Sequence, residues 1–214
     1  HTLKDNDPNK YKEDAKVFFD EISILYKDSP NIIYEICNEP SGNTVTWDDQ
    51  IKPYAEEIIP IIRKNAPKSL IIVGTPNWCK DLTSPSNNKL NHENILYSCH
   101  FYAGTHKQEL RDEIDKALQN NLPVIVSEWG TTDASGNGSV DIEESKKWIE
   151  YLNSKKISHI NWSFSNKNES SAIIRQDYLE NPDNNDTSNN EDNLKNDFND
   201  YLTESGKFVK SIFN

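Results

Sequence analysis

The sequence lacks methionine altogether and has only three cysteines among its 214 residues. Cys37, Cys79 and Cys99 are odd in number and show no CxxC spacing, which argues against a disulfide framework and a cysteine zinc site. We therefore predict that the three cysteines are small, buried residues near strand ends. The start at His1 and the missing methionine indicate a processed, trimmed, engineered or partial chain.

Basic residues are scarce relative to acidic ones. The chain has 23 Lys and Arg against 35 Asp and Glu, and therefore a formal net charge of −12. Nucleic acid and anionic membrane surfaces both require clustered basic residues, so neither is an expected partner. No apolar run approaches the roughly 18 residues of a membrane-spanning helix, and no signal-peptide pattern is present.

The sequence does contain a regular alternation of short apolar runs and amphipathic stretches. The runs are rich in Ile and Val and typical of strands buried on both faces: Asn31–Cys37, Ser69–Gly74, Asn94–Tyr102, Pro123–Gly130 and His159–Phe164. Helical periodicity occurs in Tyr11–Tyr26, Ile51–Lys64, Gln108–Gln119, Ile142–Asn153 and Glu204–Phe213. This alternation predicts βα units around a parallel sheet, the α/β class.

One segment differs from the rest of the chain. Residues 177–200 are dense in Asn and Asp and almost free of aliphatic side chains. That composition predicts a solvated, poorly ordered insertion within a single domain that spans residues 1–214.

Two of the predicted strands end in a carboxylate. Glu39 lies in Asn38-Glu39-Pro40, and Glu128 lies in Ser127-Glu128-Trp129-Gly130. Because the carboxyl ends of parallel strands face one crevice, we expect the two glutamates to converge there. A lone glutamate at a strand end is usually a solvated residue or a helix cap. Two convergent carboxylates are what glycoside hydrolysis requires.

The motifs around these residues carry a family resemblance. The segments NIIYEICNEP, HFYAGTH, PVIVSEWG, HINWSFSNK and NESSA together resemble glycoside hydrolase family 5, and more narrowly its bacterial-type endo-β-1,4-glucanases. The likeness runs from His1 to about Ile174 and resumes over the last helix. It implies a (β/α)₈ barrel that hydrolyses β-glucans with retention of anomeric configuration.

The resemblance also implies roles for the two glutamates. Glu39 would be the general acid/base and Glu128 the nucleophile. Retention requires carboxyl groups roughly 5–5.5 Å apart. Glu39 would have to stay protonated near neutrality, through burial and the negative charge of Glu128.

Further substrate-binding residues follow from the same motifs. Asn38 would hydrogen-bond the sugar 2-hydroxyl. His100 and Tyr102 lie two apart on one strand and share a face, with the Tyr hydroxyl expected near the nucleophile and the His in the hydrogen-bond network around it. His1 matches the last residue of an Asp-Trp-His motif in the family.

The remaining candidates are aromatic or charged. Trp162 would form the floor of the cleavage subsite, often through a cis peptide to the next residue, and Trp78 would line the leaving-group side. Lys167 and Glu169 match a pair that hydrogen-bonds a glucose on the non-reducing side, although such residues in a loop are usually solvated charges. Packing is the main interpretation of three other tryptophans: Trp47, Trp129 and Trp148.

The family pattern starts earlier than this chain. The sequence supplies about five of eight strands, which predicts a partial TIM (β/α)₈ barrel with two open edges and a half-exposed core. Such a fragment should associate with copies of itself through its open edges, pair with its missing part, or remain a remnant that binds glucan poorly. We favour a homo-oligomer with residual activity.

The sequence thus predicts a secreted, retaining endo-β-1,4-glucanase that acts on β-glucan polysaccharide or oligosaccharide. Secretion is expected by analogy, since polymeric cellulose cannot enter cells. Alternatives are a non-catalytic glucan-binding protein or inactive fragment, and a mannanase or xyloglucanase of the same family. No metal or organic cofactor is expected, because the two carboxyl groups supply acid, base and nucleophile.

Overall fold

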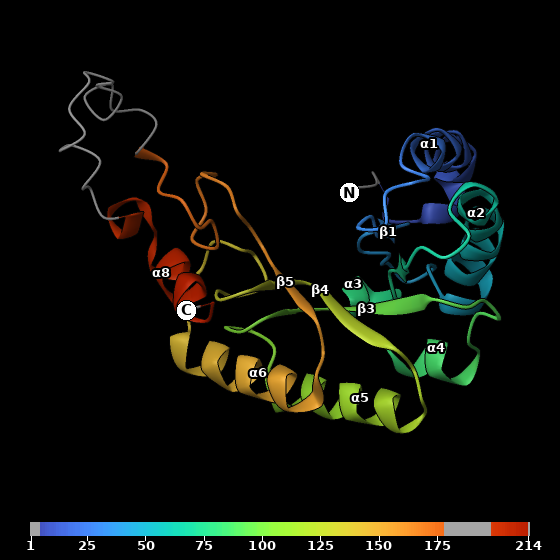
Figure 1. Cartoon of the computed structure of the whole chain (residues 1–214). Helices are drawn as coiled ribbons and strands as arrows, with labels where there is room; N and C mark the ends of the chain where they lie inside the picture. The colour runs from blue at the N-terminus through green and yellow to red at the C-terminus, as the bar shows by residue number, and fades with distance from the viewer. Residues whose placement is uncertain (1–4, 178–197, 214) are drawn as a thin grey trace, which may run out of the picture. The chain divides into compact units, whose positions relative to one another are not determined.

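The computed structural model describes residues 5–177 and 198–213 (Figure 1). The chain divides into two compact units, and the boundary passes through two strands. The N-terminal unit comprises His1–His100 with Gln108–Ser127, and the C-terminal unit comprises Phe101–Lys107 with Glu128–Asn214. The predicted substrate ligand His1 and most of the predicted insertion, residues 178–197, lie outside the described residues.

A five-stranded sheet has the order β1-β2-β3-β4-β5. Strands β1, β2 and β3 pair in parallel, with Tyr34 opposite Ile71 and Ile72 opposite Leu96. All five predicted strands are present, which confirms the prediction of βα units. Their bounds are β1 Tyr34–Glu35, β2 Ile71–Val73, β3 Ile95–Tyr102, β4 Val124–Gly130 and β5 His159–Asn161.

The prediction that every strand is buried on both faces is right in the middle of the sheet and wrong at its ends. Strands β2 and β4 are buried throughout. Glu35 of β1 and Ile160 of β5 are exposed. These two strands end the sheet order, so each has a strand neighbour on one side only among the described residues.

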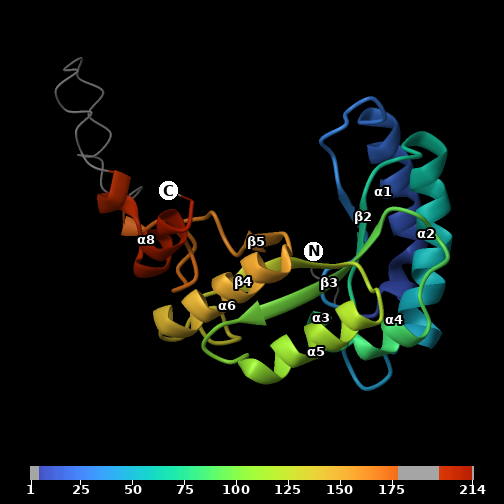
Figure 2. The ribbon, with the colours of Figure 1, turned by 60° about the horizontal axis from the view of Figure 1, so that its bottom comes forward.

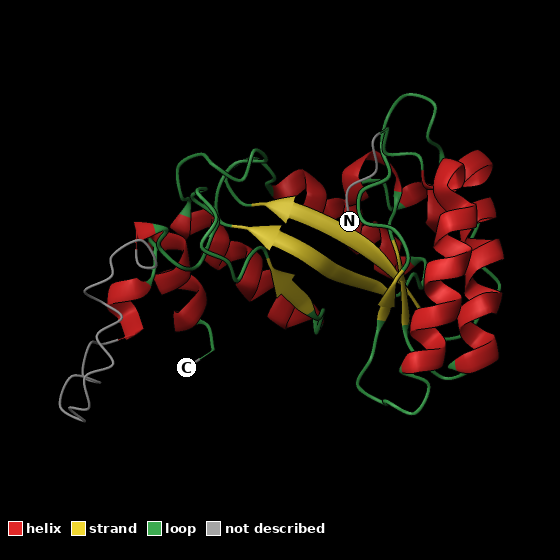
Figure 3. Cartoon of the chain, turned by 90° about the horizontal axis from the view of Figure 1, so that it is seen from above, coloured by secondary structure: helices red, strands yellow, loops and turns green. Residues whose placement is uncertain are grey.

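Two long helices cover the first strands of the N-terminal unit. Helices α1 (Lys12–Leu25) and α2 (Lys52–Asn65) lie side by side (Figures 2 and 3). The apolar face of α2 is fully buried. The apolar side chains of α1 are not all buried, because Phe18 and Leu25 are 57% and 69% exposed. Helix α5 (Gln108–Gln119) completes the unit's long helices.

Several short elements were not predicted, because side-chain caps and local turns rather than long periodic patterns define them. Asp7 accepts a hydrogen bond from the Asn9 amide, and Thr46 accepts one from the Asp49 amide. The elements are the 3₁₀ helix η1 (Pro8–Tyr11), the π-helix η2 (Trp47–Ile51), α3 (Pro76–Cys79), α4 (Thr83–Asn87) and the 3₁₀ helix η5 (Phe198–Tyr201).

The C-terminal unit is built around an aromatic stack. The Phe101 ring lies between Trp148 and Trp129, with centroid distances of 3.9 and 5.7 Å. Trp148 belongs to α6 (Ile142–Lys155), and a last helix, α8 (Glu204–Ser211), ends the unit. The buried indoles confirm the packing role predicted for Trp47, Trp129 and Trp148. No described helix is long and apolar enough to cross a membrane.

Candidate active site

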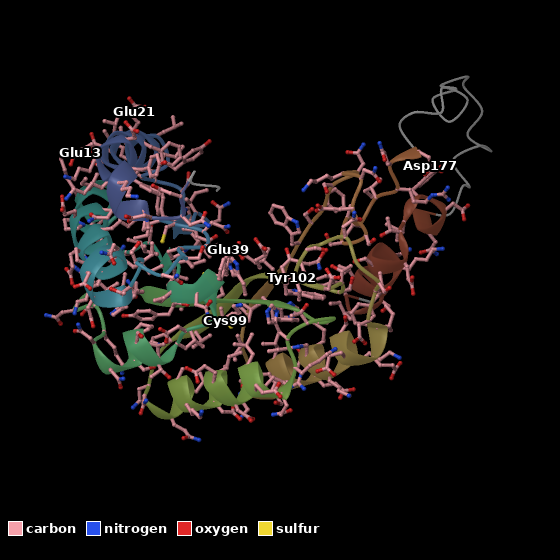
Figure 4. The ribbon with its side chains drawn as sticks, turned by 180° about the vertical axis from the view of Figure 1, so that it is seen from behind. Glu13, Glu21, Glu39, Cys99, Tyr102 and Asp177 are labelled. Carbon is pink, nitrogen blue, oxygen red and sulfur yellow. The ribbon has the colours of Figure 1, made fainter. Side chains whose placement is uncertain are left out.

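Glu39, the predicted acid/base, lies in the N-terminal unit just beyond β1 (Figure 4). Its Oε1 atom lies 2.9 Å from Nδ1 of His100. The His100 side chain is 3% exposed, whereas that of Glu39 is 29% exposed. A carboxyl in this position can exchange a proton with a ligand while the buried imidazole holds its orientation.

The other ring nitrogen of His100 leads to a buried polar cluster. Nε2 lies 3.0 Å from Oγ of Ser127, which in turn lies 2.6 Å from Oγ of Ser98. Ser127 also donates a hydrogen bond of 2.7 Å to Oε1 of Glu35. The resemblance implied that His100 lies in the hydrogen-bond network around the nucleophile, Glu128. The contacts described here connect His100 to the predicted acid/base, Glu39.

Sequence reasoning did not single out Glu35 or Ser98. Ser98 could have been found from the period of two along a strand. Ser98 precedes His100 by two residues on β3, so the two share a strand face. Glu35 carries no such signal, because β1 ends at Glu35 and Glu39 lies beyond the strand.

Close backbone contacts fix the segment that carries Glu39. Gly74 of the neighbouring strand end approaches so closely that a Cβ atom would lie 2.7 Å from the Cys37 carbonyl oxygen and 2.8 Å from that of Asn38. The same Asn38 oxygen accepts a hydrogen bond from Sγ of Cys79 at 3.0 Å. The side chain of Asn38, the predicted 2-hydroxyl ligand, is half-buried.

Trp78 lies on an unusual turn of the N-terminal unit. Asn77, Trp78 and Cys79 all have φ between 55° and 58°, although none of them is glycine. Such left-handed residues cost free energy and cluster at functional sites. The turn leaves the Trp78 side chain 46% exposed, against a pocket of about 340 Å³ that Trp47 and Asp81 also line. An exposed indole at a pocket is a suitable platform for a sugar ring.

Glu128, the predicted nucleophile, lies in the C-terminal unit on β4 and is buried. Tyr102 donates a hydrogen bond of 2.8 Å from its hydroxyl to Oε1 of Glu128, as the resemblance implied. Gly130 makes room for this ring, because a Cβ atom there would lie 2.5 Å from two Tyr102 ring carbons. The phenol orients the carboxylate and stabilises its negative charge.

Trp162 and Glu169 are also brought together in the C-terminal unit. The indole Nε1 of Trp162 donates a hydrogen bond of 3.1 Å to Oε1 of Glu169, and the Trp162–Ser163 peptide is cis. Lys167 forms an ion pair of 2.6 Å with Oε2 of Glu169. The Lys167 side chain is 65% exposed, whereas that of Glu169 is 8% exposed, so the pair presents an ammonium group above a fixed carboxylate.

The three cysteines are free and buried, as predicted. Burial raises the pKa of the Cys37 and Cys99 thiols well above the ordinary value, so both remain neutral. These thiols are therefore buried, uncharged packing groups.

The element order places the fold in the (β/α)₈-barrel class, with five parallel strands and their helices described. The chain belongs to glycosyl hydrolase family 5, because the family model described as Cellulase (glycosyl hydrolase family 5) matches residues 1–168.

Individual relatives agree with this assignment. Endoglucanase A of Evansella cellulosilytica is 52% identical over 174 residues, which are 81% of this chain and 36% of that protein. Among solved structures, Cellulase Cel5C_n matches with a TM-score of 0.88 and 39% identity, over 100% of this chain and 61% of that one.

A third match is the catalytic domain of Thermobifida fusca endoglucanase Cel5A in complex with cellotetraose. Its TM-score is 0.85 at 32% identity, over 99% of this chain and 67% of that one. The chain spans about two fifths of the length of the curated relatives it matches.

Proposed function

We propose that this chain carries the catalytic glutamates of a retaining endo-β-1,4-glucanase. The observation that supports this most directly is the hydrogen bond from Tyr102 to Glu128, in a chain of family 5. It gives a buried carboxylate one fixed donor and a fixed orientation, which a nucleophile needs and a packing residue does not.

The proposed reaction is a double displacement. The Glu128 carboxylate attacks the anomeric carbon, the glycosidic C–O bond breaks, and Glu39 gives its proton to the departing oxygen. Glu39 then takes a proton from water, the water oxygen attacks the same carbon, and Glu128 is released as a carboxylate. The two glutamates and one water molecule supply every proton and bond that the cycle needs, without a cofactor.

Four further groups would bind the glucan. Trp162 would stack against the sugar at the cleaved bond, and the Lys167–Glu169 pair would hydrogen-bond the next glucose on the non-reducing side. Trp78, with its 340 Å³ pocket, would hold the leaving-group side. Asn38 would contact the 2-hydroxyl, where a hydrogen bond strengthens in the transition state.

A chain of β-1,4-linked glucose is the substrate that we propose. The endoglucanase relatives and the Thermobifida fusca cellotetraose complex support it. A mannanase or xyloglucanase is the alternative within the family. Product analysis on defined β-1,4 oligosaccharides separates them, and turnover of mannan with no turnover of cello-oligosaccharides would exclude our choice. Because polymeric cellulose cannot enter cells, the proposed place of action is extracellular.

Self-association is the second part of the proposal. Helix α1 exposes Val17, Phe18, Ile24 and Leu25, which together form a large apolar face. A groove of about 490 Å³ runs between this helix and β1 and is lined by Phe18 and Phe19. A second copy of the chain would cover both. Light scattering should therefore give a multiple of 24.6 kDa, and a monomeric mass would exclude this part.

The activity is tested by release of reducing ends from carboxymethylcellulose. Glu39→Gln and Glu128→Gln should each lose at least about 1,000-fold in turnover, because each removes an acid, base or nucleophile that nothing replaces. Glu21→Gln on the exposed face of α1 is the matched control. Full function in both site variants would favour a non-catalytic glucan-binding protein, with Trp78 as its platform.

A further inference from the structure

The hydroxyl of Ser127 has three polar neighbours within hydrogen-bond distance. They are Oε1 of Glu35 at 2.7 Å, Oγ of Ser98 at 2.6 Å and Nε2 of His100 at 3.0 Å. A hydroxyl has one proton to donate and two lone pairs that can accept. The three neighbours therefore use its whole hydrogen-bonding capacity.

Glu35 decides which neighbour receives the Ser127 proton. Oε1 of Glu35 is an acceptor in this contact, because a carboxylate oxygen has no proton to donate. Ser127 accordingly donates to Glu35 and must accept from the other two groups. The Nε2 atom of His100 therefore carries a proton and donates it to Ser127.

The proton on Nε2 determines what Nδ1, the other ring nitrogen of His100, can do. A neutral imidazole with its proton on Nε2 presents a lone pair at Nδ1. That lone pair lies 2.9 Å from Oε1 of Glu39, so the contact is a hydrogen bond only when one proton lies between them. The proton belongs either to the Glu39 carboxyl group or to a His100 imidazolium.

We infer that Glu35 is a positioning residue which acts through Ser127, fixes the tautomer of His100 and keeps one exchangeable proton on the Glu39–His100 pair. Its role in catalysis rests on the function proposed above. Glu39 gives this proton to the departing oxygen in the first displacement and recovers one from water in the second.

The charges around the pair give the direction of the pH effect. Loss of the shared proton adds a negative charge beside the ionised Glu35, so Glu35 opposes that loss. The neighbouring thiols of Cys37 and Cys99 stay neutral, and β2 contributes only aliphatic residues. Removal of the Glu35 charge should therefore move the alkaline limb of activity to lower pH.

The kinetic test compares Glu35→Gln with Glu21→Gln, which makes the same change of charge on the outer face of α1 (Figure 4). The alkaline limb of kcat/KM should fall by about 0.5–1 pH unit in Glu35→Gln and stay in place in Glu21→Gln. Glu35→Asp keeps the charge and should keep the limb. A lower melting temperature in Glu35→Gln with an unmoved limb would show a merely structural role and overturn the inference.

A spectroscopic test separates failure of this inference from failure of the proposed function. The ¹⁵N shifts of the His100 ring, assigned by their loss in His100→Gln, report which nitrogen is protonated without any turnover. Just below the alkaline limit of the wild type, or at neutral pH if the chain is inactive, Nε2 should carry a proton. Ser127→Ala removes its acceptor, so the proton should move to Nδ1 and the ring should donate to Glu39.

Ser98→Ala is the matched control, because it leaves Ser127 able to accept from His100 and donate to Glu35. It should leave Nε2 protonated. A wild-type ring protonated on Nδ1 alone, or equal shifts in Ser98→Ala and Ser127→Ala, would overturn the inference. If the chain hydrolyses no glucan but the His100 ring shows the expected ¹⁵N shifts, the hydrogen-bond network is supported and the proposed function is rejected.

Discussion

The Tyr102 hydroxyl donates a 2.8 Å hydrogen bond to Glu128, and the ring that carries it lies directly over Gly130. The three residues come from two adjacent strands, β3 and β4. Because Gly130 has no side chain, the Tyr102 ring has room to place its hydroxyl against the Glu128 carboxylate.

Tyr102→Phe removes the donor and keeps the ring. A hydrogen bond to a charged group contributes about 1.5–3 kcal/mol, so kcat should fall roughly 10- to 100-fold. KM should change little, because the phenol binds the enzyme's own carboxylate. Steady-state kinetics on a soluble cello-oligosaccharide measures both constants. The control is Tyr26→Phe, at a partly exposed position on the C-terminal end of α1. Wild-type kcat in Tyr102→Phe would show that this hydrogen bond plays no part in turnover.

Gly130→Ala should lower kcat as Tyr102→Phe does, because it displaces the Tyr102 donor instead of removing it. The added Cβ would lie 2.5 Å from the ring carbons of Tyr102, so the ring must move and its hydroxyl must leave Glu128. Because both changes break one contact, the double variant should lose little more than either single variant. Full additivity in a double-mutant cycle would mean that the two positions act independently.

Gly74→Ala should destabilise the N-terminal unit. Its Cβ would lie within 2.8 Å of two backbone carbonyl oxygens, those of Cys37 and Asn38, which cannot swing aside as a flexible side chain can. Overpacking of this kind costs about 1–3 kcal/mol. Urea unfolding measures the free energy, and an unchanged midpoint would contradict the close approach.

His159 should make the C-terminal unit sensitive to acid. Its Nδ1 accepts a 3.0 Å hydrogen bond from the indole Nε1 of Trp129, and burial lowers its pKa below the ordinary value of about 6.5. The unfolded chain therefore binds a proton more readily than the folded one. The contribution of His159 to stability is present above pH ~6.5 and is lost as the pH falls below that value, through the lowered pKa of the folded state.

Melting temperatures across this pH range test the effect. The wild type should lose stability more steeply on acidification than His159→Gln, whose amide oxygen can still accept from Trp129. If the melting temperatures of the two proteins fell in parallel on acidification, His159 would not be the cause of the acid sensitivity.

The sequence allowed most of the fold and the main site residues to be predicted. Strands such as β4 are long apolar runs with clear ends, so the sequence alone places Glu128 near a carboxyl end. The turn at Asn77 and Trp78 could not be predicted, because left-handed backbone in ordinary residues is imposed by surrounding contacts. Exposure of Phe18 also escaped prediction, since helical periodicity defines an apolar face but not whether another element covers it.

The polar cluster around Ser127 was missed for a different reason. Attention to motifs at strand ends identifies groups that meet a substrate, whereas Ser98 lies in the middle of β3 and Glu35, the last residue of β1, lies before the Asn38-Glu39-Pro40 motif. Their importance depends on which neighbouring strand faces them, and this register is a property of the folded sheet.

Covalent trapping of the nucleophile tests the account most directly. The chain would be incubated with an activated 2-deoxy-2-fluoro-β-cellobioside, whose glycosyl-enzyme forms readily and hydrolyses slowly. Peptide mass spectrometry then locates the sugar. We predict one sugar on the peptide that contains Glu128, and no sugar there in Glu128→Gln. A chain that hydrolyses β-glucan yet carries the label on another residue, or carries none, would contradict the two-glutamate mechanism.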